Sequence, residues 1–532
     1  MNFYLNQRLR PGIKPLKYLA ILLTALWISI AVPGCSPFQS NAPTASSPGR
    51  TQTTSQATTS PPQRFDGVTL NWALLQDLIK PPIKQRIARF EALTGAKVNI
   101  TNISFPDLYD NLQKNWSGTA LKYDLAVILP RWSIDLIKQG YLEDLTARVQ
   151  SDAALQWDDV TPFFRNFSTN YQGRTYAIPL DGDFHMVYYR TDLLKEAGLT
   201  PPATWDEYLA VAKRFHGKDL NGDGEPDYGS CLGKRANDGN TTSQLISIAT
   251  PFLQTQGTAQ GAFFDPETMK PLVNNPGFAK ALDIYKQTMD YGIPQDWNLD
   301  GIKSRELFIT GRCALTLDWG DIGTLAIDPV KSKVIDKVGA VITPGTTQVF
   351  DRKTNKLVAC DKFTCPYAID GVNHAPYAAS GGWTGVIHAK AAPKVKDAAY
   401  AFLSYISQPA QSNIDVTIGG TGLNPYRISQ FKNVEPWIQS GMSTDAANNY
   451  LGAIGVSLSN QNMVFDLTIS RSQQYFNLDT IRVDFLMNKI TKKQAMQRIE
   501  QKWEQITNQV GRESQKTVYQ SSLGLKSSRG KV

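Results

Sequence analysis

The sequence lacks most of the motifs by which enzymes are recognised. It contains four histidines among 532 residues, and they are not spaced as metal ligands. It has no G-x-S-x-G and no H-E-x-x-H motif. Gly233-Lys234 has no glycine five residues before it, so the chain has no complete phosphate-binding loop either. These absences argue against a serine hydrolase, a zinc protease and an ATPase.

Long apolar runs and strong charge are also missing. The apolar run at residues 18–32 is shorter than the ~20 residues of a comfortable membrane span. It follows four basic residues without an acid and precedes small residues, which is typical of an export signal. Removal of residues 1–34 lowers the net charge from +8 to +4. No basic stripe is interleaved with aromatics, so we expect no nucleic-acid partner.

The residues that end the predicted signal indicate a lipid anchor. Residues 32–35 resemble a bacterial lipobox, in which the cysteine, here Cys35, receives a diacylglycerol; Pro33 stands where Ser, Ala or Thr is usual. The alternatives are an uncleaved anchor or an ordinary signal with a chance cysteine. We predict lipid anchoring to the bacterial cytoplasmic membrane, facing the periplasm or cell exterior. Residues 35–64, rich in Ser, Thr and Pro, are predicted to be a disordered tether.

The other four cysteines form an even set in an exported chain, where disulfides are permitted. They are Cys231, Cys313, Cys360 and Cys365. Cys360 and Cys365 would close a short loop and leave Cys231 to pair with Cys313. Three pairings exist for four cysteines, and the sequence does not choose among them.

Hydrophobic periodicity after residue 65 predicts an α/β protein. Period-two and fully apolar runs indicate strands, and apolar residues at helical spacing indicate helices between them. The predicted strands are 67–72, 97–101, 123–129, 313–317, 338–342 and 384–387, and the predicted helices are 81–94, 105–116, 278–291, 391–407 and 491–511. Some 450 residues exceed one compact core, so we expect two lobes.

Several segments resemble a known family. Residues 87–98, 188–208 and 305–320, then 381–383 with 398–407, are similar, in the family's order, to family 1 extracellular solute-binding proteins of bacterial ABC transporters, the group that contains maltose-binding protein. The resemblance implies a two-lobed periplasmic-binding-protein-like (type II) fold. Each lobe would hold a mixed, mostly parallel sheet flanked by helices, with a hinge between the lobes.

The resemblance also implies a division of the chain and a function. Lobe 1 would comprise 65–179 plus 342–412 and lobe 2 would comprise 180–341 plus 413–515, with a flexible tail at 516–532. The protein would be a monomer that catalyses nothing. It would capture a sugar or sugar-like osmolyte between the lobes and deliver it to ABC permease subunits in the membrane.

A sugar site needs flat aromatic surfaces and a few planar hydrogen-bonding groups. Residues of these types stand near strand ends and predicted lobe crossings, where α/β ligand sites lie. The candidates are Arg131, Trp132, Asp181, Asp183, Trp319 and Trp383, with Trp72 and Asn424 as weaker ones. The alternatives are that each Trp packs at a lobe edge, that Asp181 and Asp183 cap a turn, and that Arg131 pairs with a nearby acid.

One local motif is independent of the family. Oxygen-bearing side chains alternate, with glycine at the sixth place, as at the start of an EF-hand-type calcium loop. They are Asp219, Asn221, Asp223, Glu225 and Asp227. The twelfth position is Ser230, so the usual bidentate Glu is absent. We predict either a structural calcium ion or a surface turn rich in Asp and Gly, and no other cofactor.

Two other functions compete with transport. A ligand-loaded sensor that docks on a membrane receptor would use the same binding chemistry. An extracellular carbohydrate-active hydrolase would use Asp181 and Asp183 as acid and base, although residues two apart in one turn seldom face a substrate from opposite sides.

Overall fold

The computed structural model describes residues 63–78 and 81–525. The predicted signal peptide, the lipidation of Cys35 and nearly all of the predicted tether lie outside the described residues. Within the described part of the chain, no helix combines the length and apolarity that a membrane crossing requires.

The first lobe is built on a five-stranded sheet in the order β2-β1-β3-β13-β6. Its strands are β1 (Thr69–Leu75), β2 (Lys97–Ile103), β3 (Leu125–Ile128), β6 (Ile178–Pro179) and β13 (Thr384–Ile387). β1 runs parallel to β2 and β3, whereas β13 runs antiparallel to both β3 and β6. Every residue of β3 and β13 is buried, as expected for strands covered on both faces.

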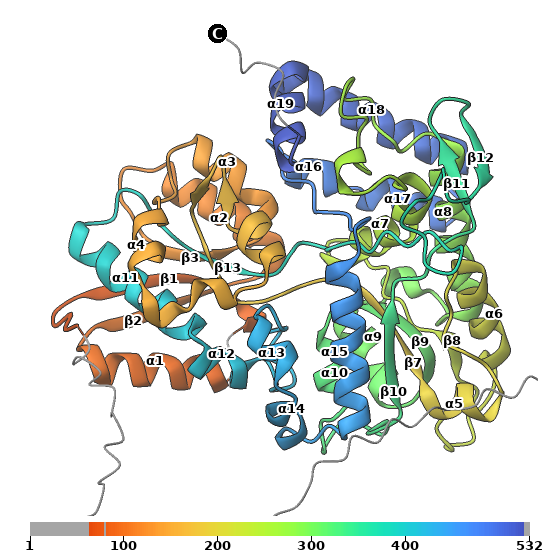
Figure 1. The fold of residues 1–532 in the computed structure, drawn as a ribbon, viewed down its shortest axis with the longest axis horizontal. Coiled ribbons are helices and arrows are strands. Elements are labelled where there is room, and N and C mark those ends of the chain that lie inside the picture. Colours follow the sequence, from red (N-terminus) through yellow and green to blue (C-terminus); the bar gives the residue numbers. More distant parts are fainter. Residues whose placement is uncertain (1–62, 79–80, 526–532) are drawn as a thin grey trace, which may run out of the picture. The chain divides into compact units, whose positions relative to one another are not determined.

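Helices cover this sheet (Figure 1). They are α1 (Pro81–Thr94), α2 (Phe105–Trp116), α3 (Ser133–Lys138), α4 (Thr146–Ser151), α11 (Pro393–Ser407) and α12 (Pro409–Asp415). α1 starts on a proline, whose missing N–H has no intrahelical partner at that position, and buries Ile83, Ile87 and Phe90. Phe90 packs edge-on against Phe402 of α11, 5.1 Å between ring centres.

The second lobe is built on a four-stranded sheet in the order β10-β7-β9-β8. Its strands are β7 (Met186–Arg190), β8 (Tyr228–Ser230), β9 (Cys313–Asp318) and β10 (Val338–Ile342). β7 is antiparallel to both β10 and β9, and only β8 and β9 are parallel. Both sheets are mixed, as predicted, but parallel pairs are not the majority in either sheet. The reason is that β7 and β13, which follow crossings between the lobes, run antiparallel to their neighbours.

Helices also surround this second sheet. They are α5 (Thr191–Glu196), α6 (Trp205–Phe215), α7 (Asn240–Leu253), α8 (Pro276–Gln287), α9 (Gly301–Ile309), α10 (Asp321–Leu325) and α15 (Thr444–Ser459). At the start of α6, Thr204 accepts from the Glu207 amide while the Glu207 carboxylate accepts from the Thr204 amide, a capping box that fixes where the helix begins.

The remaining helices close the C-terminal part of the chain. They are α13 (Ile428–Lys432), α14 (Glu435–Gln439), α16 (Ser472–Phe476), α17 (Asp479–Leu486), α18 (Lys492–Val510) and α19 (Arg512–Ser522). Earlier in the chain, two short strands, β4 (Asn170–Tyr171) and β5 (Arg174–Thr175), form a hairpin.

The predicted flexible tail is wrong for residues 516–522. They lie in α19, because buried Val518 and Tyr519 pack on the second lobe's core.

The chain crosses between the sheets at residues 180–185, again between β10 and β13, and a third time before α15, which packs on β10. Between β10 and β13, the hairpin of β11 (Gln348–Asp351) and β12 (Lys356–Ala359) packs on α7 and α8 of the second lobe. These contacts favour a later boundary than residue 342 for the return to the first lobe. The exact division of the chain stays a prediction.

Each of the predicted strands and helices is present in the structure, with some bounds shifted by two to four residues. Helix α2 has the bounds predicted from sequence, and the strands at β9, β10 and β13 agree within one residue. The last turn of the predicted helix 278–291 is a separate 3-10 turn, Thr288–Tyr291. Strong periodicity and clear stop signals explain this agreement.

Two disulfides join the four cysteines outside the predicted signal. Cys231 pairs with Cys313, 5.8 Å between Cα atoms, and Cys360 pairs with Cys365, 5.5 Å apart. The first joins the end of β8 to β9 across 82 residues of chain, whereas the second closes a loop of only 5.

We predict that removal of the long-range disulfide destabilises the protein more than removal of the short one. Loop-closure entropy assigns about 4.5 kcal/mol to the loop closed by Cys231 and Cys313 and about 2 kcal/mol to the loop closed by Cys360 and Cys365. Urea unfolding of the Cys231→Ala/Cys313→Ala and Cys360→Ala/Cys365→Ala variants measures the difference. Equal losses in the two double variants would contradict this assignment.

Candidate functional site

The segments that cross between the lobes pack backbone against backbone. Gly382 has φ +84°, and a Cβ built there would lie 2.1 Å from the carbonyl oxygen of Asp181. A Cβ at Gly182 would lie 2.3 Å from the carbonyl oxygen of Pro425. Only glycine permits such approach. Ala379 and Ser380, just before Gly382, also have positive φ, of 42° and 88°. Strained backbone of this kind is typical of functional sites and hinges.

Asp181 ties the crossing segments together. Its buried carboxylate accepts from the amides of Gly182 (2.8 Å), Trp383 (3.2 Å) and Asn424 (2.7 Å). Asp183 is also buried and accepts from the side-chain amide of Asn424 at 3.0 Å. The structure thus brings together four of the predicted site residues. Their polar atoms bind one another, which is closer to the turn-capping alternative than to ligand contact.

A partly buried arginine balances part of this negative charge. Arg305 of α9 forms ion pairs with Asp318 at the end of β9 (2.7 Å) and with Asp321 of α10 (3.2 Å). Burial raises the pKa of Asp181 to about 7. Burial and the carboxylates of Asp181 and Asp321 raise the pKa of Asp183 well above its usual range, against the opposing effect of Arg305. Asp181 and Asp183 therefore hold their protons more tightly than carboxylic acids in water do.

The predicted tryptophans occupy three different environments. Trp72 is fully buried and packs edge-on against Phe402 (5.2 Å), so it belongs to the first lobe's core. Trp319 is half-buried, and its indole N–H donates to the carbonyl of Ala379 at 2.9 Å. Trp132 and Trp383 lie together, with ring centres 6.1 Å apart. Trp132 and Trp383 are the pair whose rings pack on each other.

Phe105 and Tyr109 of α2 form an aromatic cluster with these two tryptophans. The ring of Phe105 lies 6.5 Å from that of Trp132 and 6.2 Å from that of Trp383, and the ring of Tyr109 lies 5.3 Å from that of Trp132. We call Phe105, Tyr109, Trp132 and Trp383 the aromatic corner. A Cβ at Gly239, which precedes α7 of the second lobe, would lie 2.7 Å from the Phe105 ring, so the corner also contacts the second lobe.

Beside the aromatic corner lies a groove of about 330 Å³ between the lobes. The first lobe supplies Phe105, Pro106, Tyr109, Asp110 and Arg131; the second supplies Asn237, Gly239, Thr241, Thr242, Gln473, Gln474, Phe476, Asn477 and Asp479. Rings, amides and hydroxyls dominate this lining. The arrangement can present flat apolar faces and hydrogen-bonding groups to one small molecule.

Arg131 lines the groove, yet its charge has a partner. Its Nε lies 2.9 Å from Oδ2 of Asp466, its Nη2 donates to the Ser380 hydroxyl, and its guanidinium lies over the Phe476 ring at 4.2 Å. This is the ion-pair alternative stated for Arg131, with a partner far away in the sequence.

Sequence reasoning missed several residues of the site. Arg305 lies inside one of the segments that resemble the family, which is the signal that marks it. Phe105 and Tyr109 stand at the start of a predicted helix, which is a weaker signal. No pattern in the sequence marks Asp466 or Gln473, because only tertiary folding brings that segment to Arg131.

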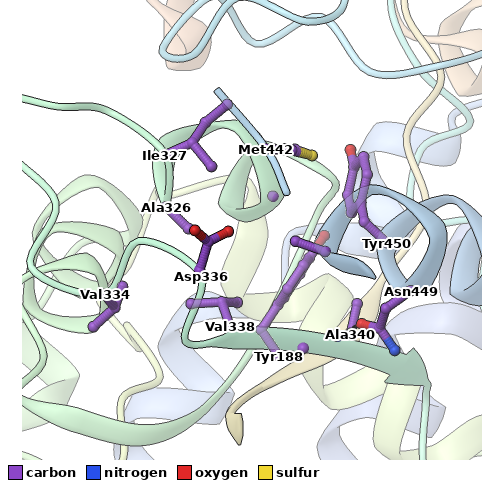
Figure 2. A pocket seen from close by; sticks show the side chains of 13 residues that line it. Tyr188, Ala326, Ile327, Val334, Asp336, Val338, Ala340, Met442, Asn449 and Tyr450 are labelled. Atoms are coloured by element: carbon purple, nitrogen blue, oxygen red, sulfur yellow. Dashed lines mark hydrogen bonds between the residues drawn. The ribbon is translucent and has the colours of Figure 1, made fainter. Parts of the chain in front are cut away.

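A second cavity, between α10, β10 and α15, is too small for a sugar (Figure 2). Its volume of about 20 Å³ suits a single water molecule. Polar groups at its edge are engaged: Asn449 accepts from the Ala340 amide at 2.7 Å, and Asp336 accepts from the Ser443 amide at 3.2 Å. This cavity is therefore a packing defect rather than a candidate binding site.

The candidate calcium loop folds as a tight turn. The carboxylate of Asp219 accepts from the amides of Asn221, Gly222, Asp223 and Gly224. Buried Asp227 pairs with Arg312 at 2.6 Å and accepts from the Leu220 amide at 2.8 Å. No group of three or more His, Cys, Asp or Glu side chains in the described residues is arranged to hold a metal ion. Calcium binding here stays a prediction.

Residues 72–412 match the family model described as bacterial extracellular solute-binding protein. A mannitol-binding protein of Pseudomonas aeruginosa is 26% identical over 280 residues, which cover 52% of this chain and 54% of the relative. The match thus spans about half the length of that curated relative.

Two solved structures share the fold. One is an ABC transporter solute-binding protein from Agrobacterium radiobacter K84 in complex with ribitol, at 22% identity and a TM-score of 0.65, covering 83% of this chain and 100% of that one. The other is maltose-bound T. maritima MalE3, at 18% identity and a TM-score of 0.65, covering 82% and 100%. These likenesses confirm the predicted two-lobed architecture.

We predict that the buried acids make the protein less stable as the pH rises. The folded-state pKa values of Asp181 and Asp183 exceed the unfolded value near 4, so their stabilising contribution is complete below about pH 4. It is lost as the pH rises through the raised pKa values, which is about 7 for Asp181. The variant Asp183→Asn lacks one of these protons. In urea titrations between about pH 4 and 8, its unfolding free energy should fall less than that of the wild type.

The matched control is Asp206→Asn, whose side chain is 75% exposed. It should follow the wild-type pH dependence. If the unfolding free energies of wild type and Asp183→Asn change equally with pH, Asp183 does not take up a proton on folding.

Proposed function

Because the chain belongs to the bacterial extracellular solute-binding protein family, we propose that it binds a sugar or sugar alcohol in the groove beside the aromatic corner. It would deliver this solute to the permease of an ABC importer. The family consists of binding proteins rather than enzymes, so the solute leaves unchanged.

The observation that carries this proposal is the chemistry of the groove lining. Rings from the first lobe face amides and hydroxyls from the second, including Thr241, Thr242 and Gln473. Sugars and sugar alcohols combine C–H surfaces with hydroxyls in this way, and binding by both lobes would favour the closed form.

The charges around the groove favour a neutral solute. Arg131 is paired with Asp466, and Asp479 is paired with Arg482 at 2.9 Å and accepts from the Asn237 amide at 2.8 Å. Asp110 is exposed to solvent at the rim. A charged solute would have to compete with these existing partners, whereas hydroxyls only add hydrogen bonds.

The names of two similar proteins support this choice. One matched relative is a mannitol-binding protein, and one structure with the same fold was solved with ribitol. Both compounds are linear sugar alcohols, which offer hydroxyls along their whole length. We therefore place sugar alcohols first among the solutes to be tested, with maltose next.

We also propose that the protein acts at the outer face of the cytoplasmic membrane, held there by lipid on Cys35. The lipobox-like sequence at residues 32–35 supports this proposal. An anchored receptor stays close to its permease, which raises the local concentration of loaded protein at the transporter.

We predict saturable binding of at least one compound from a panel of mannitol, ribitol, maltose and glucose, measured by calorimetry and thermal shift. Phe105→Ala should weaken that binding about tenfold or more, because a ring face is lost from the groove. Phe363→Ala is the matched control, since Phe363 is 76% exposed and does not line the groove. Stabilisation only by charged amines or anions would refute the neutral-solute proposal.

A further inference from the structure

We propose that Arg131 and Asp466 form a lock between the lobes, and that Asp466 is a positioning residue that holds the closed form and slows release of the solute. The effect on release rests on the proposed function, whereas the lock itself does not.

The ion pair joins residues from different lobes. Arg131 follows β3 of the first sheet, whereas Asp466 lies in a segment whose neighbours Leu467 and Ile469 belong to the second lobe's core. Both side chains are almost completely buried, with 5% and 0% exposed. Asp466 also accepts from the Tyr377 hydroxyl and from the Leu467 amide at 3.0 Å. A carboxylate so well held is a fixed anchor for the incoming guanidinium.

Backbone and side-chain contacts next to the pair join the same two segments. The Ser472 hydroxyl donates to the carbonyl of Arg131, and the Trp132 indole donates to Gln473 at 3.0 Å. The Asp135 carboxylate accepts from the Arg471 amide at 2.9 Å. Together these bonds join residues 131–135 to residues 471–473, and we call this junction between the two segments the seam.

Two further contacts extend this seam along α3. Lys138 donates to the Ser470 hydroxyl at 2.9 Å. Ile134 is 4% exposed and packs with the apolar core of the second lobe, although its helix belongs to the first. The seam therefore combines a charged pair, neutral hydrogen bonds and one apolar side chain, all of which must separate when the lobes part.

The energetics make the pair sensitive to loss of one partner. Desolvating two charges roughly cancels their attraction, so the intact pair need not hold the lobes shut alone. Removing one charge is different, because the other is then buried without compensation. Asp466→Asn would leave the Arg131 guanidinium beside a neutral amide in the closed form. Opening returns Arg131 to water, so the variant should favour the open form.

Asp466 separates this role from direct ligand contact. Arg131 lines the groove, but Asp466 does not. A change at Asp466 therefore alters closure without removing a group that faces the solute.

The chain offers a matched control for buried charge. Lys234 and Asp296 form an ion pair with 0% and 1% exposure, and both belong to the second lobe. Asp296→Asn leaves a buried cation unpaired, as Asp466→Asn does, but it breaks no contact between the lobes.

The test is hydrogen exchange on the full chain without ligand, followed in peptides that cover residues 131–138 and 466–473. Asp466→Asn should speed exchange in both segments by about tenfold or more relative to wild type. Asp296→Asn should leave these segments unchanged, even if it lowers the melting temperature as much. The double variant Arg131→Met/Asp466→Leu should restore slow exchange, because an apolar pair replaces the ionic one.

The second measurement is the dissociation rate of mannitol, ribitol or maltose from wild type and Asp466→Asn. We expect faster dissociation by about tenfold or more in the variant. Unchanged exchange in both segments, or equal effects of Asp466→Asn and Asp296→Asn on them, would overturn the lock. If wild type binds none of the three compounds, the proposed solute class fails, and the exchange result still decides whether the lock exists.

Discussion

The rest of the structure depends on one constraint: the buried carboxylate of Asp181 accepts hydrogen bonds from three backbone amides. These amides belong to the first crossing, to the start of β13 and to the segment before α13. Because glycines let the backbones touch there, no side chain separates the crossings. The contacts of Asp181 thus position both lobes and the groove between them.

The structure distinguishes two groups of polar residues, one at the crossings between the lobes and one in the groove. Asp181, Asp183 and Asn424 are satisfied by one another and by backbone, which suits a hinge that must keep its geometry. The groove beside the aromatic corner instead presents amides, hydroxyls and aromatic rings from both lobes. A hinge rich in buried acid and a groove with paired charges fit a clamp for a neutral solute better than a site for acid–base chemistry.

Much of the fold was predictable from sequence, because strands such as β3 and helices such as α2 carry strong periodicity. The family resemblance predicted a crossing at Asp181, which lies between β6 of the first sheet and β7 of the second. The roles of individual side chains were harder to predict. Trp72 is of a residue type suited to contact with a sugar, yet it lies in the core. Only its packing against Phe402 decides between these two roles. The partner of Arg131 could not be predicted, since Asp466 is more than 300 residues away along the chain.

The central claim is that two lobes close on an unaltered neutral solute beside the aromatic corner. A crystal structure of the protein grown with a sugar alcohol that stabilises it tests this claim most directly. Our account predicts the intact compound in the groove between Tyr109 and Gln473, with Arg131 still paired to Asp466. A compound bound elsewhere, a cleaved or modified compound, or lobes that do not enclose it would contradict the account.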